Sequence, residues 1–170
     1  GHTEASPERV FECAAKGVSV CTHLTNATGC SIYPTRYGGT REVPFDEAIM
    51  LCDNVFCEII HDARGVHVRP TMIKLILKTM VAVTDACTGA LDDDDINIVN
   101  GELYGSKLRM YQVARNFKNN LGMNEVDIFK ICSRNPSRAV KMDGEVGTLE
   151  VGKKANVVIV DPDYSICKVI

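Results

Sequence analysis

The chain has 170 residues, of which 45% are hydrophobic, and this is enough to bury the core of one domain. Its formal net charge is −3, and no basic stripe is interleaved with aromatic residues, which argues against a nucleic-acid partner. No apolar run approaches the roughly 18 residues that a membrane span needs, and no signal peptide is recognisable, so we expect a cytoplasmic protein without a membrane partner.

The eight cysteines are dispersed along the chain, several of them within apolar runs, and no Cys-x-x-Cys pair occurs. A small secreted domain that depends on disulfides has regularly spaced cysteines instead. We therefore expect buried thiols in a reducing compartment, and neither a disulfide framework nor a zinc–thiolate site.

The first predicted elements are a helix and a strand, and each lies next to a histidine. Ser6 is a typical N-cap for a helix over 7–16, because a proline occupies the first helical position. The apolar run 18–22 then predicts a strand that leads directly into His23. One helix and one strand therefore separate His2 from His23, which is the spacing of successive units in a parallel α/β fold.

The same alternation continues along the chain. Its next members are a helix over 44–52, a strand over 55–60, a helix that begins at Pro70 and a strand over 80–84. His61 follows the first of these strands, with His67 shortly after it, and Asp85 follows the second. Parallel strands share one carboxyl edge, where barrel enzymes place their chemistry, so we expect Asp85 on the same edge as His2 and His23. We assign His61 a structural role.

The pattern changes after Asp85. The chain continues with an acidic run over 92–95 and a hairpin over 96–104 that turns at Asn100–Gly101. A helix over 106–121 follows, and then a helix capped by Asn124 that breaks at Asn135–Pro136 and restarts as a short helical turn. The last predicted elements are strands over 147–149 and 157–160, joined by a turn at 152–154. The acidic run is most simply a solvated turn. We expect the last two strands to form an antiparallel piece that packs apart from the α/β part.

The number of predicted parallel strands is too small for a closed barrel. A (β/α)8 barrel needs eight strands and about 250 residues. Three such strands are predicted here, and His2 already stands where a strand should have ended. We therefore expect the chain to be the back half of a larger enzyme.

Short motifs along almost the whole chain resemble those of one enzyme family. They are His-Thr-Glu-Ala at 2–5, Thr-His-Leu-Thr-Asn-Ala at 22–27, Gly-Val-His-Val at 65–68, Val-Thr-Asp-Ala at 83–86, Gly-Ser-Lys-Leu at 105–108, Asn-Pro-Ser-Arg-Ala at 135–139 and Gly-Thr-Leu-Glu-Val-Gly-Lys-Lys-Ala-Asn at 147–156. In this order they resemble the later motifs of the N-acetylglucosamine-6-phosphate deacetylases, which belong to the metal-dependent amidohydrolase superfamily of TIM-barrel hydrolases.

The resemblance implies an α/β fold. Residues 1–143 would form the C-terminal part of a TIM (β/α)8 barrel, from about strand 5 or 6 to strand 8, and residues 144–170 a segment of a small β-sandwich. The implied activity is deacetylation of N-acetylglucosamine 6-phosphate to glucosamine 6-phosphate and acetate, a step of amino-sugar catabolism.

Carried over residue by residue, the resemblance also implies a metal site and a catalytic group. His2 and His23 match the two metal-binding histidines of the family, and neutral imidazoles suit zinc, iron or a similar divalent ion. Asp85 matches the catalytic aspartate, which takes a proton from metal-bound water and later gives it to the departing amine.

The implied substrate contacts lie in the loops. Asn26 and the backbone of Ala27 match the pair that contacts the sugar phosphate, and His67 matches a substrate-binding histidine. Arg36 is the counterpart of a phosphate-binding arginine that reaches a neighbouring subunit's site, with Arg41 as the alternative; a bidentate guanidinium suits a phosphate dianion. The implied assembly is a homo-oligomer, most simply a dimer.

The chain also departs from the family pattern. The family's metal-binding glutamate and carbonyl-polarising histidine come from an earlier part of the barrel, so the chain alone is expected to bind metal poorly and to be inactive. Ala63–Arg64 looks like an insertion, and the acidic run 92–95 stands where a hairpin contacts substrate. Negative charge there disfavours a phosphorylated sugar, so two alternatives stay open. The substrate could be another amide or a cyclic amide, or the chain could be an inert half barrel. The unpaired edge strands of a half barrel favour self-association.

Overall fold

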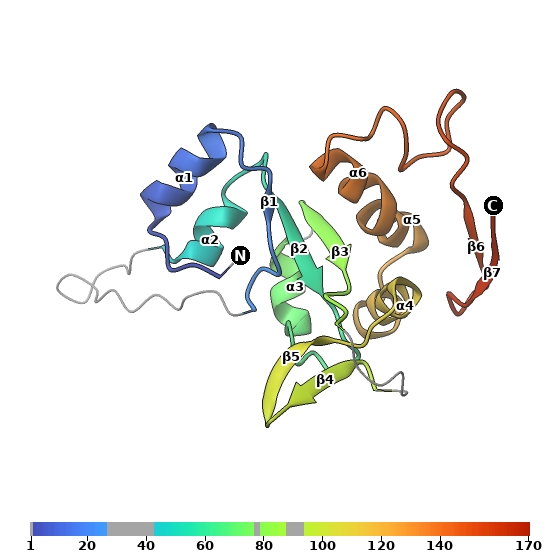
Figure 1. Cartoon of the computed structure of the whole chain (residues 1–170), viewed down its shortest axis with the longest axis horizontal. Coiled ribbons are helices and arrows are strands. Elements are labelled where there is room, and N and C mark those ends of the chain that lie inside the picture. The colour runs from blue at the N-terminus through green and yellow to red at the C-terminus, as the bar shows by residue number, and fades with distance from the viewer. Residues whose placement is uncertain (1, 27–42, 77–78, 88–93) are drawn as a thin grey trace.

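The computed structural model describes residues 2–26, 43–76, 79–87 and 94–170 (Figure 1). Within these residues, three parallel strands form a sheet in the order β1–β2–β3, with bounds Val20–Cys21, Phe56–Ile60 and Met80–Val83. The register pairs Cys21 with Cys57 and Ile59 with Ala82. The predicted order of parallel strands is therefore confirmed.

The first strand is shorter than the predicted run 18–22. The backbone of His23 has a φ of +30°, which turns the chain away from the sheet after two paired residues. The amide of Leu24 still donates to the carbonyl of Glu58 at 2.9 Å, so this turn stays attached to the edge of β2.

Three short helices cover the sheet next to these strands. They are α1 (Pro7–Ala15), α2 (Phe45–Met50) and α3 (Pro70–Ile76), and α1 and α2 lie beside β1 in Figure 1. The predicted cap of α1 is confirmed, because the hydroxyl of Ser6 accepts a hydrogen bond from the amide of Arg9 at 3.4 Å. Each helix buries apolar side chains in one core, among them Val10, Ile49 and Ile73.

Further helices pack on the β3 side of the sheet. They are α4 (Met110–Leu121), α5 (Glu125–Phe129) and α6 (Asn135–Ala139), and the π-helical turn η2 (Lys130–Arg134) joins α5 to α6. The predicted restart at Asn135–Pro136 is confirmed, because α6 begins at Asn135 with the proline in its first turn, where a missing amide proton costs little. The interruption before it is a π turn rather than a break in the helical path. The buried Asn135 side chain donates to the carbonyl of Met80 at 2.8 Å and so ties α6 to β3.

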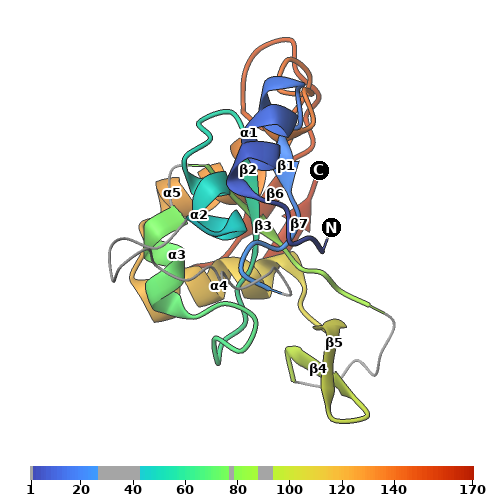
Figure 2. The same cartoon turned by 90° about the vertical axis from the view of Figure 1, so that its left-hand side faces the viewer.

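The predicted hairpin is confirmed and projects away from the rest of the chain (Figures 1 and 2). Its strands are β4 (Ile96–Val99) and β5 (Glu102–Ser106), and they pair antiparallel. The turn residues Asn100 and Gly101 both have positive φ, +53° and +83°, as an Asn–Gly hairpin turn requires. The helix predicted from residue 106 begins only at Met110, since Ser106 is the last residue of β5.

The C-terminal strands are not the predicted pair. β6 (Val158–Val160) pairs antiparallel with β7 (Ile166–Val169), and residues 147–149 form no strand. Gly147 has a φ of +95° and its carbonyl accepts a hydrogen bond from the Ser133 hydroxyl at 3.1 Å; a Cβ at this position would overlap the side chain of Ser137. The glycine is therefore used for close contact with α6.

The loop between β6 and β7 packs on the helices, although side chains of both strands stay exposed. Tyr164 is buried and its ring centroid lies 6.0 Å from that of Phe129. Arg115 of α4 donates to the carbonyl of Asp163 at 2.7 Å and to the hydroxyl of Ser165 at 3.1 Å. The expected separation from the α/β part therefore fails for this loop, and Val160 of β6 also packs against the core.

The cysteines among the described residues are free thiols, and Cys30 lies outside those residues. Cys13, Cys21, Cys52, Cys57, Cys87, Cys132 and Cys167 are all unpaired. Burial raises the pKa of Cys21 to about 12 and that of Cys57 to about 11, which keeps both protonated. Within the part of the chain that the structure describes, no helix is both long and apolar enough to cross a bilayer.

Candidate active site

The carboxyl ends of the three parallel strands form one edge of the sheet, which we call the carboxyl edge. His23, Asp62 and Asp85 each stand two residues beyond the end of β1, β2 and β3, respectively. Neighbouring strands lie about 4.8 Å apart, so His23 and Asp85, which follow the outer strands, flank Asp62 across roughly 10 Å of sheet. The predicted gathering of strand-end residues on one edge is therefore present.

The backbone along this edge is strained. His23, Thr25 and Asp85 have φ values of +30°, +68° and +48°, in or near the left-handed region that side-chain-bearing residues seldom adopt. For Thr25, which is β-branched, this conformation is a clear outlier. Strain of this kind concentrates at functional sites, and here it follows β1 and β3.

The two predicted metal ligands meet at this edge. The Nε2 atoms of His2 and His23 lie 3.2 Å apart, and the rings stand edge to face at 73° with centroids 4.9 Å apart. A tetrahedral zinc ion with Zn–N bonds of about 2.0–2.1 Å would hold two nitrogens about 3.3 Å apart. The separation therefore fits two ligands of one ion.

The pair does not make a complete site by itself. Among the described residues, no group of three or more His, Cys, Asp or Glu side chains is arranged to hold a metal ion. The Nδ1 atom of His23 is buried and has no hydrogen-bond partner, whereas a metal-bound histidine normally donates its second N–H to a carbonyl or carboxylate. The residues present thus fit part of a metal site.

Asp85 combines a fixed backbone with an exposed side chain. Its carbonyl accepts a hydrogen bond from the amide of Ser106 at 2.8 Å, and the amide of Cys87 donates to the carbonyl of Ser106 at 3.0 Å. The hydroxyl of Ser106 donates to the carbonyl of Thr84. β5 therefore holds the backbone of Asp85 on both sides, while its side chain is exposed at the edge.

His67 lies deeper, in a buried ion pair with Asp62. Both side chains are completely buried, with His67 Nδ1 3.0 Å from Asp62 Oδ2 and His67 Nε2 3.1 Å from the carbonyl oxygen of Gly105. Because a carboxylate and a carbonyl can only accept, both ring nitrogens carry protons and the imidazole is cationic. The substrate contact predicted for His67 would need Nε2 to leave this carbonyl.

The environment of this pair favours both charges. Burial lowers the pKa of His67, but the hydrogen bonds to Asp62 and Gly105 outweigh it and the pKa is raised. Burial raises the pKa of Asp62, but hydrogen bonds from the His67 ring and from the amides of Val66 and His67 hold it far below its usual range. Sequence reasoning assigned no role to Asp62, although it directly precedes the loop that carries the Gly-Val-His motif.

The remaining predicted site residues are only partly placed. Asn26 is half-buried, and its backbone amide donates to the carbonyl of His23 at 3.0 Å. Ala27, Arg36 and the alternative Arg41 lie outside the described residues.

Comparison with known proteins shows the family of the chain. Residues 2–170 match the model of the Amidohydrolase family. The chain belongs to the amidohydrolase family.

Individual relatives of this amidohydrolase are deacetylases. The N-acetylglucosamine-6-phosphate deacetylase of Bacillus subtilis is 27% identical over 190 residues, which cover 100% of this chain and 45% of the relative. The N-acetylgalactosamine-6-phosphate deacetylase of Escherichia coli O157:H7 is 28% identical over 61% of this chain and 32% of its own length. The crystal structure of the Pasteurella multocida N-acetylglucosamine-6-phosphate deacetylase matches with a TM-score of 0.81 at 25% identity, over 100% of this chain and 48% of that one. The chain thus spans about half the length of the N-acetylglucosamine-6-phosphate deacetylases that it matches.

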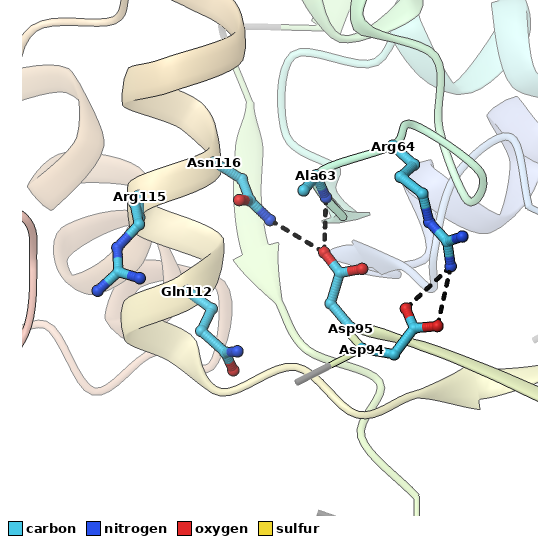
Figure 3. A pocket seen from close by; sticks show the side chains of 7 residues that line it. All are labelled: Ala63, Arg64, Asp94, Asp95, Gln112, Arg115 and Asn116. Atoms are coloured by element: carbon cyan, nitrogen blue, oxygen red, sulfur yellow. Dashed lines mark hydrogen bonds and ion pairs between the residues drawn. The ribbon is translucent and has the colours of Figure 1, made fainter. Parts of the chain in front are cut away.

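Two segments that depart from the resemblance in the sequence contact each other: Ala63–Arg64 and the described part of the acidic run, Asp94–Asp95. A pocket of about 460 Å³ lies beyond β2 and is lined by Ala63, Arg64, Asp94, Asp95, Gln112, Arg115 and Asn116 (Figure 3). Arg64 pairs with Asp94 at 2.9 Å, and the carboxylate of Asp95 accepts from the amide of Ala63 at 2.6 Å. The pocket contains none of the predicted site residues, but Ala63 and Arg64, which look like an insertion in the sequence, contact two residues of the acidic run there.

His61, which follows β2 and is assigned a structural role, has both ring nitrogens buried without a hydrogen-bond partner among the described residues. It is fully buried, its ring centroid lies 4.8 Å from that of Phe117, and burial lowers its pKa. Its carbonyl accepts a hydrogen bond from the Asn116 side chain at 2.9 Å, which connects β2 to α4.

Proposed function

We propose that the chain supplies two metal-binding histidines and a proton-shuttling aspartate to a metal-dependent amidohydrolase that removes the N-acetyl group of N-acetylglucosamine 6-phosphate. The observation that carries this proposal is the 3.2 Å approach of His2 and His23 at the edge where Asp85 also stands. The similarity to deacetylases at 27% identity supports the same activity.

The proposed architecture follows the resemblance. β1, β2 and β3 would be barrel strands 6, 7 and 8, with His2 at the end of strand 5, and residues 144–170 would belong to a small β-sandwich. The exposed side chains of β6 and β7 support this, because a two-stranded hairpin is only marginally stable without further strands.

The proposed chemistry needs one metal ion and one carboxylate. A divalent ion such as zinc or iron, bound by His2, His23 and ligands from elsewhere in the whole protein, would activate water and polarise the amide carbonyl. Asp85 accepts a proton from the attacking water and returns it to the amine nitrogen as the C–N bond breaks, so that acetate and a free amine leave. The exposure of its side chain permits both transfers.

The proposed substrate carries a phosphate, for which Asn26, the backbone of Ala27 and Arg36 or Arg41 are the candidate contacts. In a dimer, the arginine would reach the site of the partner. The acidic run argued against a phosphate, but Arg64 offsets the charge of Asp94 and the carboxylate of Asp95 is held by the backbone of Ala63. These contacts account for two of the four aspartates, while Asp92 and Asp93 lie outside the described residues.

N-acetylgalactosamine 6-phosphate is a second candidate substrate, favoured by the relative from E. coli O157:H7. Release of free amine should be measured for the whole, metal-loaded protein with both sugar phosphates and with unphosphorylated N-acetylglucosamine. We expect the glucosamine phosphate to give the highest kcat/KM and loss of the phosphate to reduce it roughly tenfold or more. Absence of amine release from all three compounds would reject the proposal. Hydrolysis of a cyclic amide instead would support the alternative of a different amide substrate.

A further inference from the structure

The ion pair behind the carboxyl edge is connected to the proposed catalytic group through one glycine. We propose that His67, held by Asp62, is a positioning residue that fixes the carbonyl of Gly105 and, through the contact of Gly105 with Asp85, fixes the place of the Asp85 carboxylate. This inference rests on the proposed function, since it gives Asp85 the role of proton shuttle.

The first link is the hydrogen bond from the His67 ring to the carbonyl of Gly105. The His67 ring has no freedom to turn, because Asp62 holds Nδ1 at 3.0 Å while Nε2 donates to the Gly105 carbonyl at 3.1 Å. Asp62 is itself fixed by backbone amides of Arg64, Val66 and His67 at 2.9–3.0 Å. The donor that faces Gly105 is therefore rigid, charged and completely buried.

The second link is the contact of Gly105 with Asp85. Gly105 has a φ of +58°, and a Cβ built on it would lie only 2.8 Å from the carbonyl oxygen of Asp85. The next residue, Ser106, donates its amide to that same oxygen at 2.8 Å. A shift of Gly105 is therefore passed directly to a backbone that already has a left-handed φ of +48° at Asp85.

These two links explain features that a substrate-binding role leaves unexplained. A substrate contact needs an accessible donor, whereas both nitrogens of His67 face acceptors of the chain itself.

The hairpin offers a matched pair of variants for the test. Gly105→Ala places a methyl group against Asp85, whereas Gly101→Ala introduces the same group at a similar positive φ, where no atom lies within 4 Å of the built Cβ. In the whole, metal-loaded protein we expect Gly105→Ala to lower kcat on the order of 10–100-fold with KM unchanged, because small misplacements of a catalytic group cost that much. Gly101→Ala should keep its kcat, and equal kcat values for the two variants would overturn the proposal.

Variants of His67 provide a second test that does not depend on Gly105→Ala folding. His67→Gln and His67→Met both remove the charge beside Asp62, but only the glutamine keeps an N–H for the Gly105 carbonyl. We expect His67→Gln to recover at least part of the kcat that His67→Met loses, at similar melting temperatures. Equal kcat values for His67→Gln and His67→Met would overturn the positioning role and favour a structural one. Equally raised KM values for the two variants would overturn it in favour of a substrate-binding role.

The same assay separates this inference from the proposed function. If Gly105 acts through Asp85, Gly105→Ala should cause no further loss of kcat in an Asp85→Asn background. Normal turnover of Asp85→Asn would reject the proton shuttle itself. Impaired turnover of Asp85→Asn, together with a fully additive loss from Gly105→Ala, would reject only the positioning role.

Discussion

The buried Asp62–His67 pair predicts how the stability of the fold depends on pH. Hydrogen bonds to Asp62 and the Gly105 carbonyl, with the charges of Asp62 and Asp85, raise the pKa of His67 despite the opposing effect of burial. Hydrogen bonds from His67 and from the amides of Val66 and His67 lower the pKa of Asp62, again against burial. Each group therefore binds protons differently in the folded and unfolded chain, which makes stability pH-dependent.

The direction of each effect follows from the direction of the shift. The raised pKa of His67 stabilises the fold fully below the unfolded value of about 6.5, and this contribution is lost as pH rises through the folded value. The lowered pKa of Asp62 stabilises the fold above the unfolded value of about 3.9, and this is lost as pH falls through the folded value. Both contributions are complete between about pH 4 and pH 6.5, and each changes by at most about 1.4 kcal/mol per pH unit outside that window.

Asp62→Asn removes the charge that compensates His67. Breaking a buried ion pair at one partner costs about 3–5 kcal/mol, so urea unfolding followed by circular dichroism at pH 5.5 should show a loss of that size. The loss should shrink at pH 9, and the fall in stability above pH 6.5 should flatten in the variant. Asp94→Asn is the matched control, because its pair with Arg64 is 49–59% exposed and such pairs contribute at most about 1 kcal/mol. Equal losses for the two variants, or a wild-type stability that does not change between pH 5.5 and pH 9, would refute this reasoning.

Two further predictions concern the thiols and the metal. Cys21 and Cys57, whose pKa values burial raises to about 12 and about 11, should resist iodoacetamide at pH 8 in the folded protein, while the exposed Cys167 is alkylated. Mass spectrometry of the labelled peptides checks this, and labelling of Cys21 at the rate of Cys167 would contradict it. His23→Ala should lower metal affinity in the whole protein by at least about a hundredfold in competition with a chelator, and unchanged metal content by elemental analysis would exclude His23 as a ligand.

Local patterns were sufficient to predict the elements that lead to the carboxyl edge. The Ser6 cap, the Asn100–Gly101 turn and the strands before His23 and Asp85 each depend on residues close in sequence, and all are present. The placement of His2 against His23 needed only the parallel order of the strands, which the helix–strand alternation predicts.

Contacts between distant segments account for what the sequence did not reveal. The sequence predicts a helix from Ser106, but the hydroxyl of Ser106 bonds to the carbonyl of Thr84, 22 residues earlier, and the helix begins only at Met110. Gly147 resembles the start of a strand but is required for close contact with Ser137. The Gly-Val-His motif marks His67 as important, yet its acceptor on Gly105 lies 38 residues away, so no local pattern could show that both ring nitrogens are occupied.

The most direct test of this account is Asp85→Asn in the whole, metal-loaded protein, with turnover and melting temperature measured side by side. Asparagine is isosteric and tolerates the left-handed φ of +48°, so the melting temperature should stay within about 2 °C of the wild type. The variant lacks the base, so we expect turnover of N-acetylglucosamine 6-phosphate to fall by roughly a hundredfold or more. A stable variant with near-normal turnover would contradict the catalytic role of Asp85. A destabilised variant that keeps its turnover would indicate that Asp85 only caps the following loop.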